Sequence, residues 1–377
     1  MDSLNAKRIP CFAQAMTPDS FIPDCAGGLE VFRAINDRAR RRRFPFAASA
    51  ALTYRCNLEC VHCYARTSAD ARREWSTEQW KDQLDQLAKS DCLFLLITGG
   101  EPLLRPDFAD IYRYARACGL VVTVFTNGTR ITDEIVELFR AYPPRNVDVT
   151  VYGASESTTR AITGRAGVLD SCLTGVRKLK DGGVRVGLKT VAMTLNRGEI
   201  EALEALADGL GVPFRLDASI FPRFDGDTGP LKYRLSPREI ADIDFATPVR
   251  AGHWKSHYQR RCHKLGEGAL YRCSAGRTHA HINPHGELQP CITTSHIRFP
   301  LAGSDFPVVW QRMKDALECR RAHPDSTCIH CEKHVLCGYC PGFSRLETGD
   351  ESGVSPFLCE LGQERSRRII DMTEAVG

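Results

Sequence analysis

Three cysteines follow a short apolar segment in the stretch Ala50-Ala-Leu-Thr-Tyr-Arg-Cys56-Asn-Leu-Glu-Cys60-Val-His-Cys63. The apolar part predicts a strand over Ala50–Arg55, which puts the cysteines in the loop that leaves its carboxyl end. Three thiolates fill only three of the four iron positions of a [4Fe–4S] cube, so one iron stays open to an external ligand. A structural zinc site is the alternative, but it wants four ligands, and His62 is awkwardly constrained as the fourth beside Cys63.

Beyond this stretch, β-rich apolar segments alternate with amphipathic helical segments up to residue 219. A helix is predicted over Thr77–Lys89, with Ser76 as its N-cap. Six alternations of strand and helix imply parallel units that close, fully or in part, into a TIM-like (β/α)6 barrel of the α/β class. Ligands are then expected at the carboxyl ends of the strands. The other five predicted strands are Cys92–Thr98, Val121–Phe125, Val147–Tyr152, Val184–Val191 and Phe214–Ser219.

The composition divides the chain into four parts. Residues 1–45 form an N-terminal leader segment, and residues 46–220 form the barrel. Residues 221–259 are rich in Pro, Gly and Asp and are predicted to form a bridging segment with one short helix after Ser236. Residues 260–377 have little long periodicity and many closely spaced cysteines, as expected of a small domain whose core is partly replaced by metal sites.

Seventeen cysteines among 377 residues, with a net charge of only +4, limit the classes of protein that fit. A reducing cytoplasm disfavours disulfides, so ligation of a metal or cluster is the leading explanation for so many cysteines. No segment approaches the roughly 20 apolar residues that span a bilayer, and the N-terminus lacks a signal-peptide core. We therefore expect a cytoplasmic protein without a membrane or nucleic-acid partner.

A glycine-rich loop, Thr98-Gly-Gly-Glu-Pro102, follows the second predicted strand. Its glycines let backbone approach a ligand closely, and Glu101 offers an acceptor. Such a run alone marks an ordinary turn, but one β-α unit after the cysteine loop it indicates a ligand-binding loop of a barrel. Lys189, Asn196 and Asp217 also fall near predicted strand ends, where each is either a site residue or a solvated or core polar group.

A second group of cysteines occupies the last third of the chain with regular spacing. Twelve residues separate Cys273 from Gly286, and four more lead to Cys291. Two C-x2-C pairs follow, which by themselves would permit a pair of structural zinc sites. The members of the group are Cys273, Cys291, Cys328, Cys331, Cys337, Cys340 and Cys359.

The C-x3-C-x2-C loop after the first strand resembles the signature of radical S-adenosylmethionine (radical SAM) enzymes, and the resemblance covers nearly the whole chain. It implies a catalytic [4Fe–4S] cluster on Cys56, Cys60 and Cys63, whose open iron is chelated by S-adenosylmethionine. An electron from the cluster then cleaves the sulfonium, and the resulting 5′-deoxyadenosyl radical abstracts hydrogen from the substrate. His62 matches the aromatic position that lies against the adenine in that family.

The resemblance also assigns cofactor-binding roles to the loops that follow the next strands. The residues Gly99, Gly100, Glu101 and Pro102 match the loop that binds the amino group of the methionyl moiety. Asn127 and Thr150 are expected near the ribose hydroxyls, because amide and hydroxyl side chains can bond them. The family often has a serine and an aspartate where this chain has Thr150 and Tyr152, so the match is conservative at the first position and departs at the second.

The later cysteines resemble the SPASM extension of radical SAM proteins, which carries two auxiliary [4Fe–4S] clusters and brings the expected number of clusters to three. The resemblance implies a distal cluster on Cys328, Cys331, Cys337 and Cys359. A proximal cluster falls to Cys273, Cys291 and Cys340, which leaves it one ligand short. Either Cys262 supplies the missing ligand or the site is open to substrate, water or a thiol. Two residues separate Cys337 from Cys340, where three are more usual.

Enzymes with this extension usually act on peptides or proteins. We therefore predict an iron–sulfur oxidoreductase or maturase that abstracts hydrogen from a peptide or protein and takes part in the maturation of a ribosomal peptide, by crosslinking or oxidation. The alternative enzyme modifies side chains of haem or another tetrapyrrole. A non-enzymatic zinc-binding module is a third possibility, which the intact Gly99–Pro102 motif disfavours.

The same resemblance suggests protein partners. A leader-peptide-recognition domain needs on the order of 80 residues, more than the segment before Cys56 provides. We therefore expect a separate leader-peptide-recognition protein and a reductant such as flavodoxin or ferredoxin.

Overall fold

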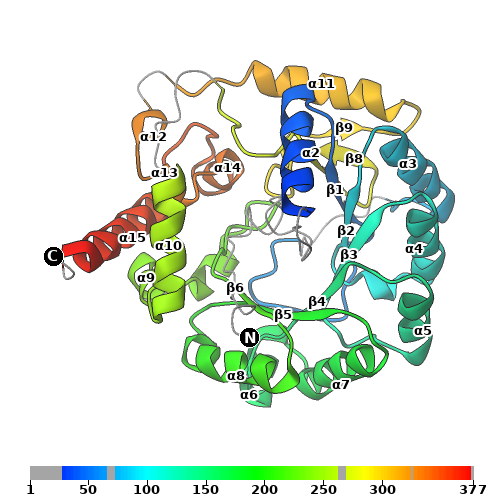
Figure 1. Ribbon diagram of the computed structural model, residues 1–377, viewed down its shortest axis with the longest axis horizontal. Helices are drawn as coiled ribbons and strands as arrows, with labels where there is room; N and C mark the ends of the chain where they lie inside the picture. Colours follow the sequence, from blue (N-terminus) through cyan, green and yellow to red (C-terminus); the bar gives the residue numbers. More distant parts are fainter. Residues whose placement is uncertain (1–27, 66–72, 262–268, 324–325, 375–377) are drawn as a thin grey trace.

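One curved sheet organises the computed structural model, which describes residues 28–65, 73–261, 269–323 and 326–374. In these ranges nine strands are hydrogen-bonded in the order β6-β5-β4-β3-β2-β1-β7-β8-β9. Strands β1 to β7 run parallel, and β8 and β9 run antiparallel to their neighbours (Figure 1). The strands are β1 Ala47–Ala51, β2 Phe94–Thr98, β3 Val121–Thr126, β4 Asn146–Thr150, β5 Val186–Val191, β6 Phe214–Asp217, β7 His279–Ile282, β8 Glu287–Gln289 and β9 Phe299–Pro300.

Helices cover the outer face of strands β1 to β6 (Figure 1). Each lies between two successive parallel strands in the chain, which confirms the prediction of a partial (β/α)6 barrel. The predicted helix over Thr77–Lys89 is α3, and its N-cap Ser76 forms a capping box with Gln79. The barrel helices are α3 Thr77–Lys89, α4 Phe108–Ala117, α5 Asp133–Ala141, α6 Glu156–Thr163, α7 Val168–Asp181 and α8 Ile200–Leu210, with short 3₁₀ turns η2 Pro102–Leu104 and η3 Arg197–Glu199.

All six predicted barrel strands are present, but the first is displaced toward the N-terminus. It was expected over Ala50–Arg55 and is found over Ala47–Ala51, every residue of which is buried. After β1 the backbone no longer continues the strand ladder and instead bonds the glycine-rich loop. The amide of Gly100 donates to the carbonyl of Thr53 at 2.7 Å, and that of Glu101 donates to the carbonyl of Arg55 at 2.9 Å.

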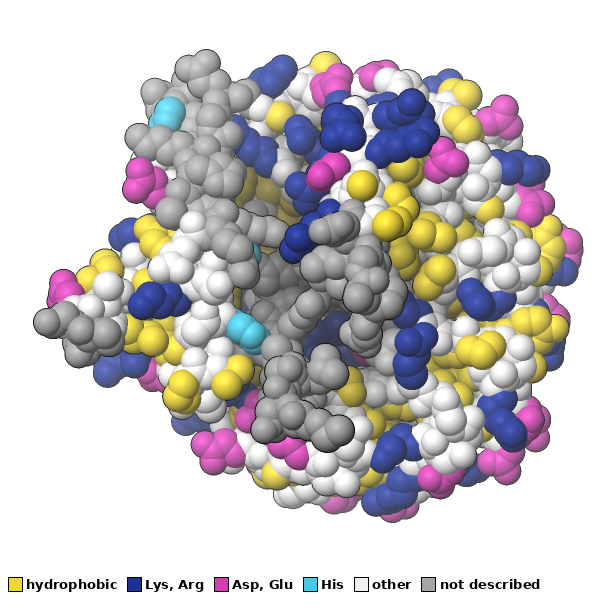
Figure 2. All heavy atoms as spheres, in the orientation of Figure 1, with side chains coloured by type: hydrophobic (Ala, Val, Ile, Leu, Met, Phe, Trp, Pro, Cys, Tyr) yellow, Lys and Arg dark blue, Asp and Glu magenta, His cyan; other side chains and the backbone are white. Residues whose placement is uncertain are grey.

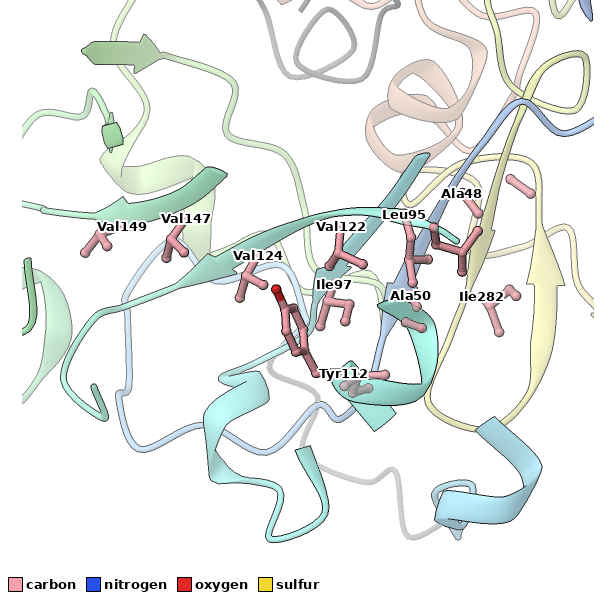
Figure 3. Close-up of a cluster of buried hydrophobic side chains, with 14 of the residues drawn as sticks. Ala48, Ala50, Leu95, Ile97, Tyr112, Val122, Val124, Val147, Val149 and Ile282 are labelled. Carbon is pink, nitrogen blue, oxygen red and sulfur yellow. The ribbon is translucent and has the colours of Figure 1, made fainter. Parts of the chain in front are cut away.

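The core fills the space between the sheet and the barrel helices (Figure 3). Alternate residues of a strand point to the same face, so Ala48 and Ala50 meet the helices, while Ser49 faces the barrel interior. The fully buried Ile97 and Val122 extend this layer, and Tyr112 of α4 closes it. Burial of each large apolar side chain contributes roughly 1.5–3 kcal/mol. The barrel therefore rests on an apolar outer layer, which leaves its inner face available for polar side chains.

The cysteine-rich region extends the barrel sheet. Strand β7 pairs with β1, with His281 opposite Ser49, and β8 and β9 continue the sheet as an antiparallel ribbon. Most of the later helices pack together beside the barrel (Figure 1). Outside the barrel the helices are α2 Gly28–Arg42, α9 Pro237–Asp244, α10 Pro248–Arg261, α11 Phe306–Glu318, α12 Thr327–His330, α13 His334–Cys337, α14 Pro341–Thr348 and α15 Pro356–Glu374, with the 3₁₀ turn η4 Gly229–Tyr233.

The bridging segment holds two helices where one was predicted. Helix α9 begins after Ser236, as expected, with a capping box to Glu239. Helix α10 follows it, although its sequence is only weakly amphipathic. Its Trp254 is buried against Leu336 and Ile369 from the C-terminal helices. Tertiary packing therefore stabilises a helix that local periodicity did not predict.

The surface of the face in Figure 1 carries a concentration of positive charge. Lys and Arg side chains gather where α2 and α11 lie (Figure 2). The last turn of α2 contains Arg40, Arg41 and Arg42, and cations are favourable at a helix C-terminus. Within the described ranges, no helix combines the length and apolar character needed to cross a membrane.

Candidate active site

A cavity of about 570 Å³ opens at the carboxyl ends of the barrel strands. It is bordered by the cysteine loop after β1, the glycine-rich loop after β2 and the ends of β3 to β6. Residues of the C-terminal region close another part of its wall. The lining residues important here are Cys56, Cys60, His62, Cys63, Gly99, Gly100, Phe125, Asn127, Thr150, Tyr152, Lys189, Arg215, Asp217, Cys273 and Cys291.

The three cysteines of the first loop border this cavity together. Cys60 is buried, Cys63 is half-buried and Cys56 is exposed. Helix α6 holds the loop, because the carbonyl of Thr163 accepts the amide of Glu59 at 2.9 Å. Burial raises the pKa of the Cys60 thiol above its ordinary value. A buried thiol of this kind stays protonated unless a bound metal or cluster replaces its proton.

His62 presents a neutral aromatic ring beside the cysteines. Burial lowers its pKa to about 4, and its Nδ1 atom has no hydrogen-bond partner among the described residues. The ring of Tyr152 lies 5.0 Å away between centroids, at an interplanar angle of 65°. Tyr152, which stands where the resembled family often has an aspartate, thus places a second aromatic ring in the same cavity wall.

The two glycines of the second loop are required by close backbone contact. Gly99 has a φ of 149°, and a Cβ atom there would lie 2.3 Å from the carbonyl oxygen of Thr53. At Gly100 a Cβ atom would lie 2.4 Å from the carbonyl oxygen of Arg55. Both contacts are with the segment that leads into the cysteine loop. The motif therefore lets two loops of the cavity touch backbone to backbone.

Glu101 lies buried behind these glycines and joins two strand ends. Its carboxylate accepts the hydroxyl of Thr126 at 2.8 Å and the amide of Asn127 at 2.7 Å. Burial raises its pKa, although these hydrogen bonds act in the opposite direction. Pro102 begins the turn η2 and is also buried. The carboxylate thus fixes the loop after β3 against the loop after β2.

Asn127 connects this arrangement to the cysteine loop. Its Nδ2 atom donates to Oδ1 of Asn57 at 2.9 Å and lies 3.9 Å from Sγ of Cys56. Its own Oδ1 atom accepts the hydroxyl of Thr129 at 2.7 Å. Thr150 ends β4 and is half-buried in the cavity wall. The cavity therefore brings together both residues that the sequence placed at these strand ends.

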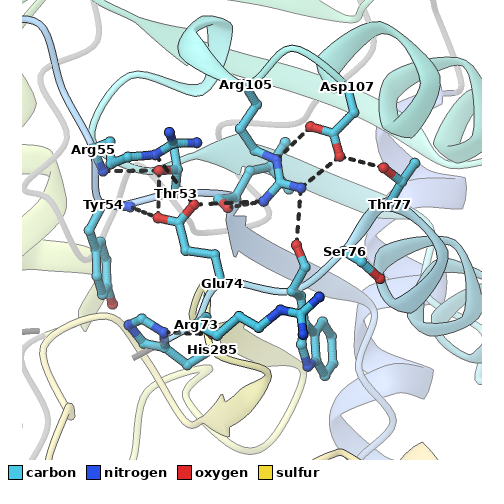
Figure 4. Close-up of polar contacts among 12 residues, drawn as sticks. Thr53, Tyr54, Arg55, Arg73, Glu74, Ser76, Thr77, Arg105, Asp107 and His285 are labelled. Carbon is cyan, nitrogen blue, oxygen red and sulfur yellow. Dashed lines mark hydrogen bonds and ion pairs between the residues drawn. The ribbon is translucent and has the colours of Figure 1, made fainter. Parts of the chain in front are cut away.

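A polar network behind the cysteine loop was not predicted from the sequence (Figure 4). Arg105 donates to the carbonyl of Leu52 at 2.9 Å and to that of Trp75 at 3.0 Å, and it pairs with Asp107. Glu74 accepts the hydroxyl of Thr53 at 2.6 Å. A buried arginine cannot be told from a solvated one by its neighbours in the chain, so no local signal predicted this support for the end of β1.

Two of the proposed proximal ligands lie on either side of one hydroxyl. Oγ1 of Thr293 is 3.7 Å from Sγ of Cys291 and 3.7 Å from Sγ of Cys340. Cys273 and Cys291 border the main cavity together with the first cysteine loop. Cys262 lies outside the described residues. The structure thus places cysteines from both groups around one space.

The four proposed distal ligands surround a second cavity, of about 350 Å³. Its lining includes Cys328, Cys331, Cys337 and Cys359. Gly338 has a φ of 69° and ends α13 in the left-handed region, which turns the chain between Cys337 and Cys340. This turn separates Cys337, which lines the second cavity, from Cys340, which lies beside Thr293.

The donor atoms at both cavities suit an iron–sulfur cluster. They are thiols from several segments around a space of substantial volume, and thiolates are the usual ligands of such clusters. In the described part of the chain, no group of three or more His, Cys, Asp or Glu side chains is arranged to hold a metal ion. The described cysteines form no disulfides with one another.

The remaining polar residues at strand ends separate into two kinds. Lys189 and Asp217 line the cavity. Asn196 is fully buried and donates to the carbonyls of Tyr152 at 2.8 Å and Val191 at 3.0 Å. Its Oδ1 atom accepts the amide of Met193 at 2.8 Å. Asn196 therefore stabilises backbone, whereas Lys189 and Asp217 face the space that a ligand would fill.

Comparison with known sequences identifies a matching family and two kinds of enzyme that are similar to this chain. The model of the Radical SAM superfamily matches residues 51–208. The mycofactocin maturase MftC of Mycolicibacterium smegmatis is 30% identical over 310 residues, which cover 78% of this chain and 77% of that protein. The AdoMet-dependent heme synthase of Methanosarcina barkeri is 26% identical over 332 residues, covering 81% of this chain and 94% of that protein.

Comparison with solved structures supports the fold. Streptococcus suis SuiB bound to the precursor peptide SuiA has a TM-score of 0.66 at 16% identity, covering 88% of this chain and 80% of that one. The structure of anSMEcpe with bound AdoMet has a TM-score of 0.67 at 13% identity, covering 88% of this chain and 99% of that one. At these identities the similarity establishes the shared fold alone.

Proposed function

Because this chain belongs to the radical SAM superfamily and is therefore an enzyme, we propose that Cys56, Cys60 and Cys63 are the ligands of its catalytic [4Fe–4S] cluster. Membership of the family implies S-adenosylmethionine and one such cluster. The observation that carries the assignment is the shared cavity, which the three cysteines border together with Gly99 and Gly100. When bound, the cluster supplies the electron that cleaves S-adenosylmethionine to a 5′-deoxyadenosyl radical, which abstracts hydrogen from the substrate.

The protein's own residues would bind and orient the cofactor. The neutral ring of His62 offers a flat apolar surface for the adenine, supported by Tyr152. The backbone at Gly99 and Gly100 lies close enough to the cavity to contact the methionyl group. Glu101 and Pro102 belong to the same loop, in which the Glu101 carboxylate also holds the amide of Asn127.

The ribose would lie near the ends of β3 and β4. Asn127 and Thr150 both border the cavity there, and an amide and a hydroxyl can exchange hydrogen bonds with ribose hydroxyls. The side chain of Asn127 already bonds Asn57 and Thr129. A further bond to the ribose would therefore link the cofactor to the cysteine loop.

The substrate that we propose is a peptide or protein, as in the maturation of ribosomal peptides. A maturase is 30% identical to this chain, and a fold relative is solved with a precursor peptide. Haem or tetrapyrrole modification is the second candidate, because the matched heme synthase aligns over 94% of its length. A zinc-binding module without activity is not supported, since the chain belongs to an enzyme family.

We further propose that residues 260–377 form a SPASM domain with two auxiliary [4Fe–4S] clusters, next to a barrel of residues 46–220. The distal cavity supports a cluster on Cys328, Cys331, Cys337 and Cys359. The proximity of Cys291 and Cys340 to Thr293 supports a proximal cluster with Cys273. Cys262 remains the proposed eighth ligand, with an open site as the alternative. Residues 1–45 and 221–259 would be the leader and bridging segments.

Protein partners follow from the same function. Reductive cleavage needs an electron donor, for which flavodoxin or ferredoxin is suitable, and a leader-bearing precursor would need a separate recognition protein. A reducing cytoplasm would keep the many thiols available for cluster assembly. No nucleic acid or membrane partner is proposed.

Anaerobic reconstitution with iron and sulfide tests the core of this proposal. The reconstituted protein, given S-adenosylmethionine and dithionite, is expected to form 5′-deoxyadenosine. Cys60→Ala should lose this reaction, whereas Cys118→Ala, at a half-buried position at the end of α4 that does not line the cavity, should keep it. Equal rates for the Cys60→Ala variant and the native protein would overturn the assignment.

A further inference from the structure

The side chain of Lys189 lines the main cavity, and no described carboxylate is hydrogen-bonded or ion-paired with it. It lies on β5, and its Nζ atom is 3.1 Å from the centroid of the Phe125 ring. It makes no hydrogen bond or ion pair with any described residue. Three N–H donors of an ammonium are thus left for a ligand, and a cation removed from water without an acceptor is costly.

Arg215 lies beside Lys189 but is already paired. The two residues are opposite each other in the β5–β6 ladder, and the guanidinium of Arg215 lies 5.1 Å from the same Phe125 ring. An Oδ2 atom of Asp148 lies 3.2 Å from the Arg215 guanidinium. Asp217 accepts the amide of Ser219 at 2.8 Å. Lys189 is therefore the member of this cation pair that no described carboxylate contacts directly, although Asp148, Asp217 and Glu101 lie near enough to raise its pKa.

A bound anion would stabilise the charged form of Lys189. Burial lowers the pKa of Lys189 well below its ordinary value, and the neighbouring Arg215 acts in the same direction, whereas Asp148, Asp217 and Glu101 raise it. A bound anion would oppose the two lowering effects and restore the charged ammonium. The aromatic face of Phe125 gives partial compensation, because a cation over a ring is attracted to it.

The position of Lys189 points to the substrate. In the sheet, β4, β3 and β2 lie between β5 and β1, so Lys189 and the cysteine loop occupy separate parts of one cavity wall. The cofactor groups proposed above are accounted for by the cysteine loop, the glycine-rich loop and the ends of β3 and β4. Lys189 is a cavity cation that none of these roles uses.

We propose that Lys189, with Arg215 beside it, binds a carboxylate of the peptide substrate and so orients that substrate in the cavity. The inference rests on the proposed peptide-modifying function. The carboxylate comes either from the C-terminus of the peptide or from an Asp or Glu side chain. Both present the same pair of acceptor oxygens to an ammonium.

Direct binding of small probes tests this without relying on turnover. The cluster-loaded protein, saturated with S-adenosylmethionine, is titrated calorimetrically with N-acetylphenylalanine, N-acetylphenylalaninamide and the α-amide of N-acetylglutamic acid. At least one carboxylate probe is expected to bind ten-fold or more tightly than the uncharged amide. Tighter binding of N-acetylphenylalanine indicates a terminal carboxylate. Tighter binding of the α-amide of N-acetylglutamic acid indicates a side-chain carboxylate.

Variants show whether Lys189 causes the preference. In Lys189→Met the preference should fall to two-fold or less, and Lys189→Arg, which keeps the charge, should retain it. Lys178→Met is the matched control, because Lys178 lies on α7 outside the cavity lining and pairs with Asp133 at 2.7 Å. It should behave like the native protein.

Three results would overturn the proposal. The first is that the native protein shows no preference for a carboxylate probe. The second is that the preference survives in Lys189→Met. The third is a ten-fold loss of S-adenosylmethionine affinity in Lys189→Met, which would assign the lysine to the cofactor. A failure of the proposed function is recognised separately, because it would appear as missing 5′-deoxyadenosine or unmodified peptide while the probe preference persisted.

Discussion

Arg365 and Asp244 form a buried ion pair between helices α15 and α9, with 2.8 Å from Nε to Oδ2 and 2.7 Å from the second guanidinium nitrogen. Arg365 also donates to the carbonyl of Leu336 at 2.6 Å, and its guanidinium lies 3.9 Å from the centroid of the Trp254 ring. One side chain thus connects four helices. Because α15 also carries Cys359, the shape of the distal cavity depends on this connection.

Replacing Arg365 by Ala should therefore lower the free energy of unfolding by about 3–5 kcal/mol, because the Asp244 carboxylate is left buried without its partner. Denaturant titration measures this. Arg367→Ala is the control, since Arg367 is exposed and pairs at the surface with Glu364. Its effect should stay within about 1 kcal/mol. Equal losses in the two variants would contradict a special role for the buried pair.

The Gly99→Ala variant should lose most S-adenosylmethionine binding, because the new Cβ atom would lie 2.3 Å from the carbonyl oxygen of Thr53. The glycine-rich loop would then have to move away from the cysteine loop. Equilibrium dialysis with labelled S-adenosylmethionine measures the loss. In Gly209→Ala, on helix α8, the added methyl group meets open space, so binding should be unchanged. Native affinity in Gly99→Ala would show that the close contact is dispensable.

Replacing Cys56, Cys60 and Cys63 together by Ala should remove one cluster and abolish cleavage of S-adenosylmethionine. The native protein is expected to hold roughly twelve irons in three four-iron clusters, and the variant about eight. Iron and sulfide analysis after anaerobic reconstitution measures both. Stoichiometric zinc with little iron in the native protein would refute the cluster assignment altogether.

The Cys291→Ala/Cys340→Ala double variant should separate radical formation from product formation. The proposed catalytic cluster keeps all its cysteines, so some 5′-deoxyadenosine should still form, while modified substrate should not. Mass spectrometry of the peptide and chromatography of the nucleoside follow the two products. Loss of the proximal ligands can also unfold a domain that ligation stabilises, so circular dichroism and residual iron must be recorded. A folded variant with native product rate would make the proximal site structural.

Glu351 should make the stability of the C-terminal region depend on pH. Burial alone would raise its pKa, but hydrogen bonds from His296 and Arg320 lower it below the usual 4.5. A carboxylate with a lowered folded-state pKa stabilises the fold at pH values above its unfolded-state pKa. That stabilisation is lost as the pH falls through the folded-state pKa. The free energy of unfolding should therefore decrease below about pH 4.5, and Glu351→Gln should reduce that dependence. Identical pH profiles for the two proteins would contradict this role.

The cysteine loop, the glycine-rich loop and the six barrel strands could be predicted because their signals are local. Cysteine spacing, turn residues and strand-length apolar runs are properties of a few consecutive residues, and parallel strand–helix units bring their carboxyl ends to one edge. The edge that carries the ligand cavity was predicted for the same reason. The ends of β1 were less accurate, because contacts with the glycine-rich loop decide where that strand stops.

The amino-acid sequence by itself thus determined the family, the order of the barrel elements and which loops approach the cofactor, since each depends on residues that are close in the chain. Only the tertiary structure decided that Asn196 bonds backbone while Lys189 faces the cavity, although both stand near strand ends. It alone decided the pairing of Arg365 with Asp244, which are 121 positions apart. Burial and hydrogen-bond partners depend on segments that are distant in the chain. Tertiary contacts therefore decide whether a polar residue near a strand end binds a ligand or stabilises the structure.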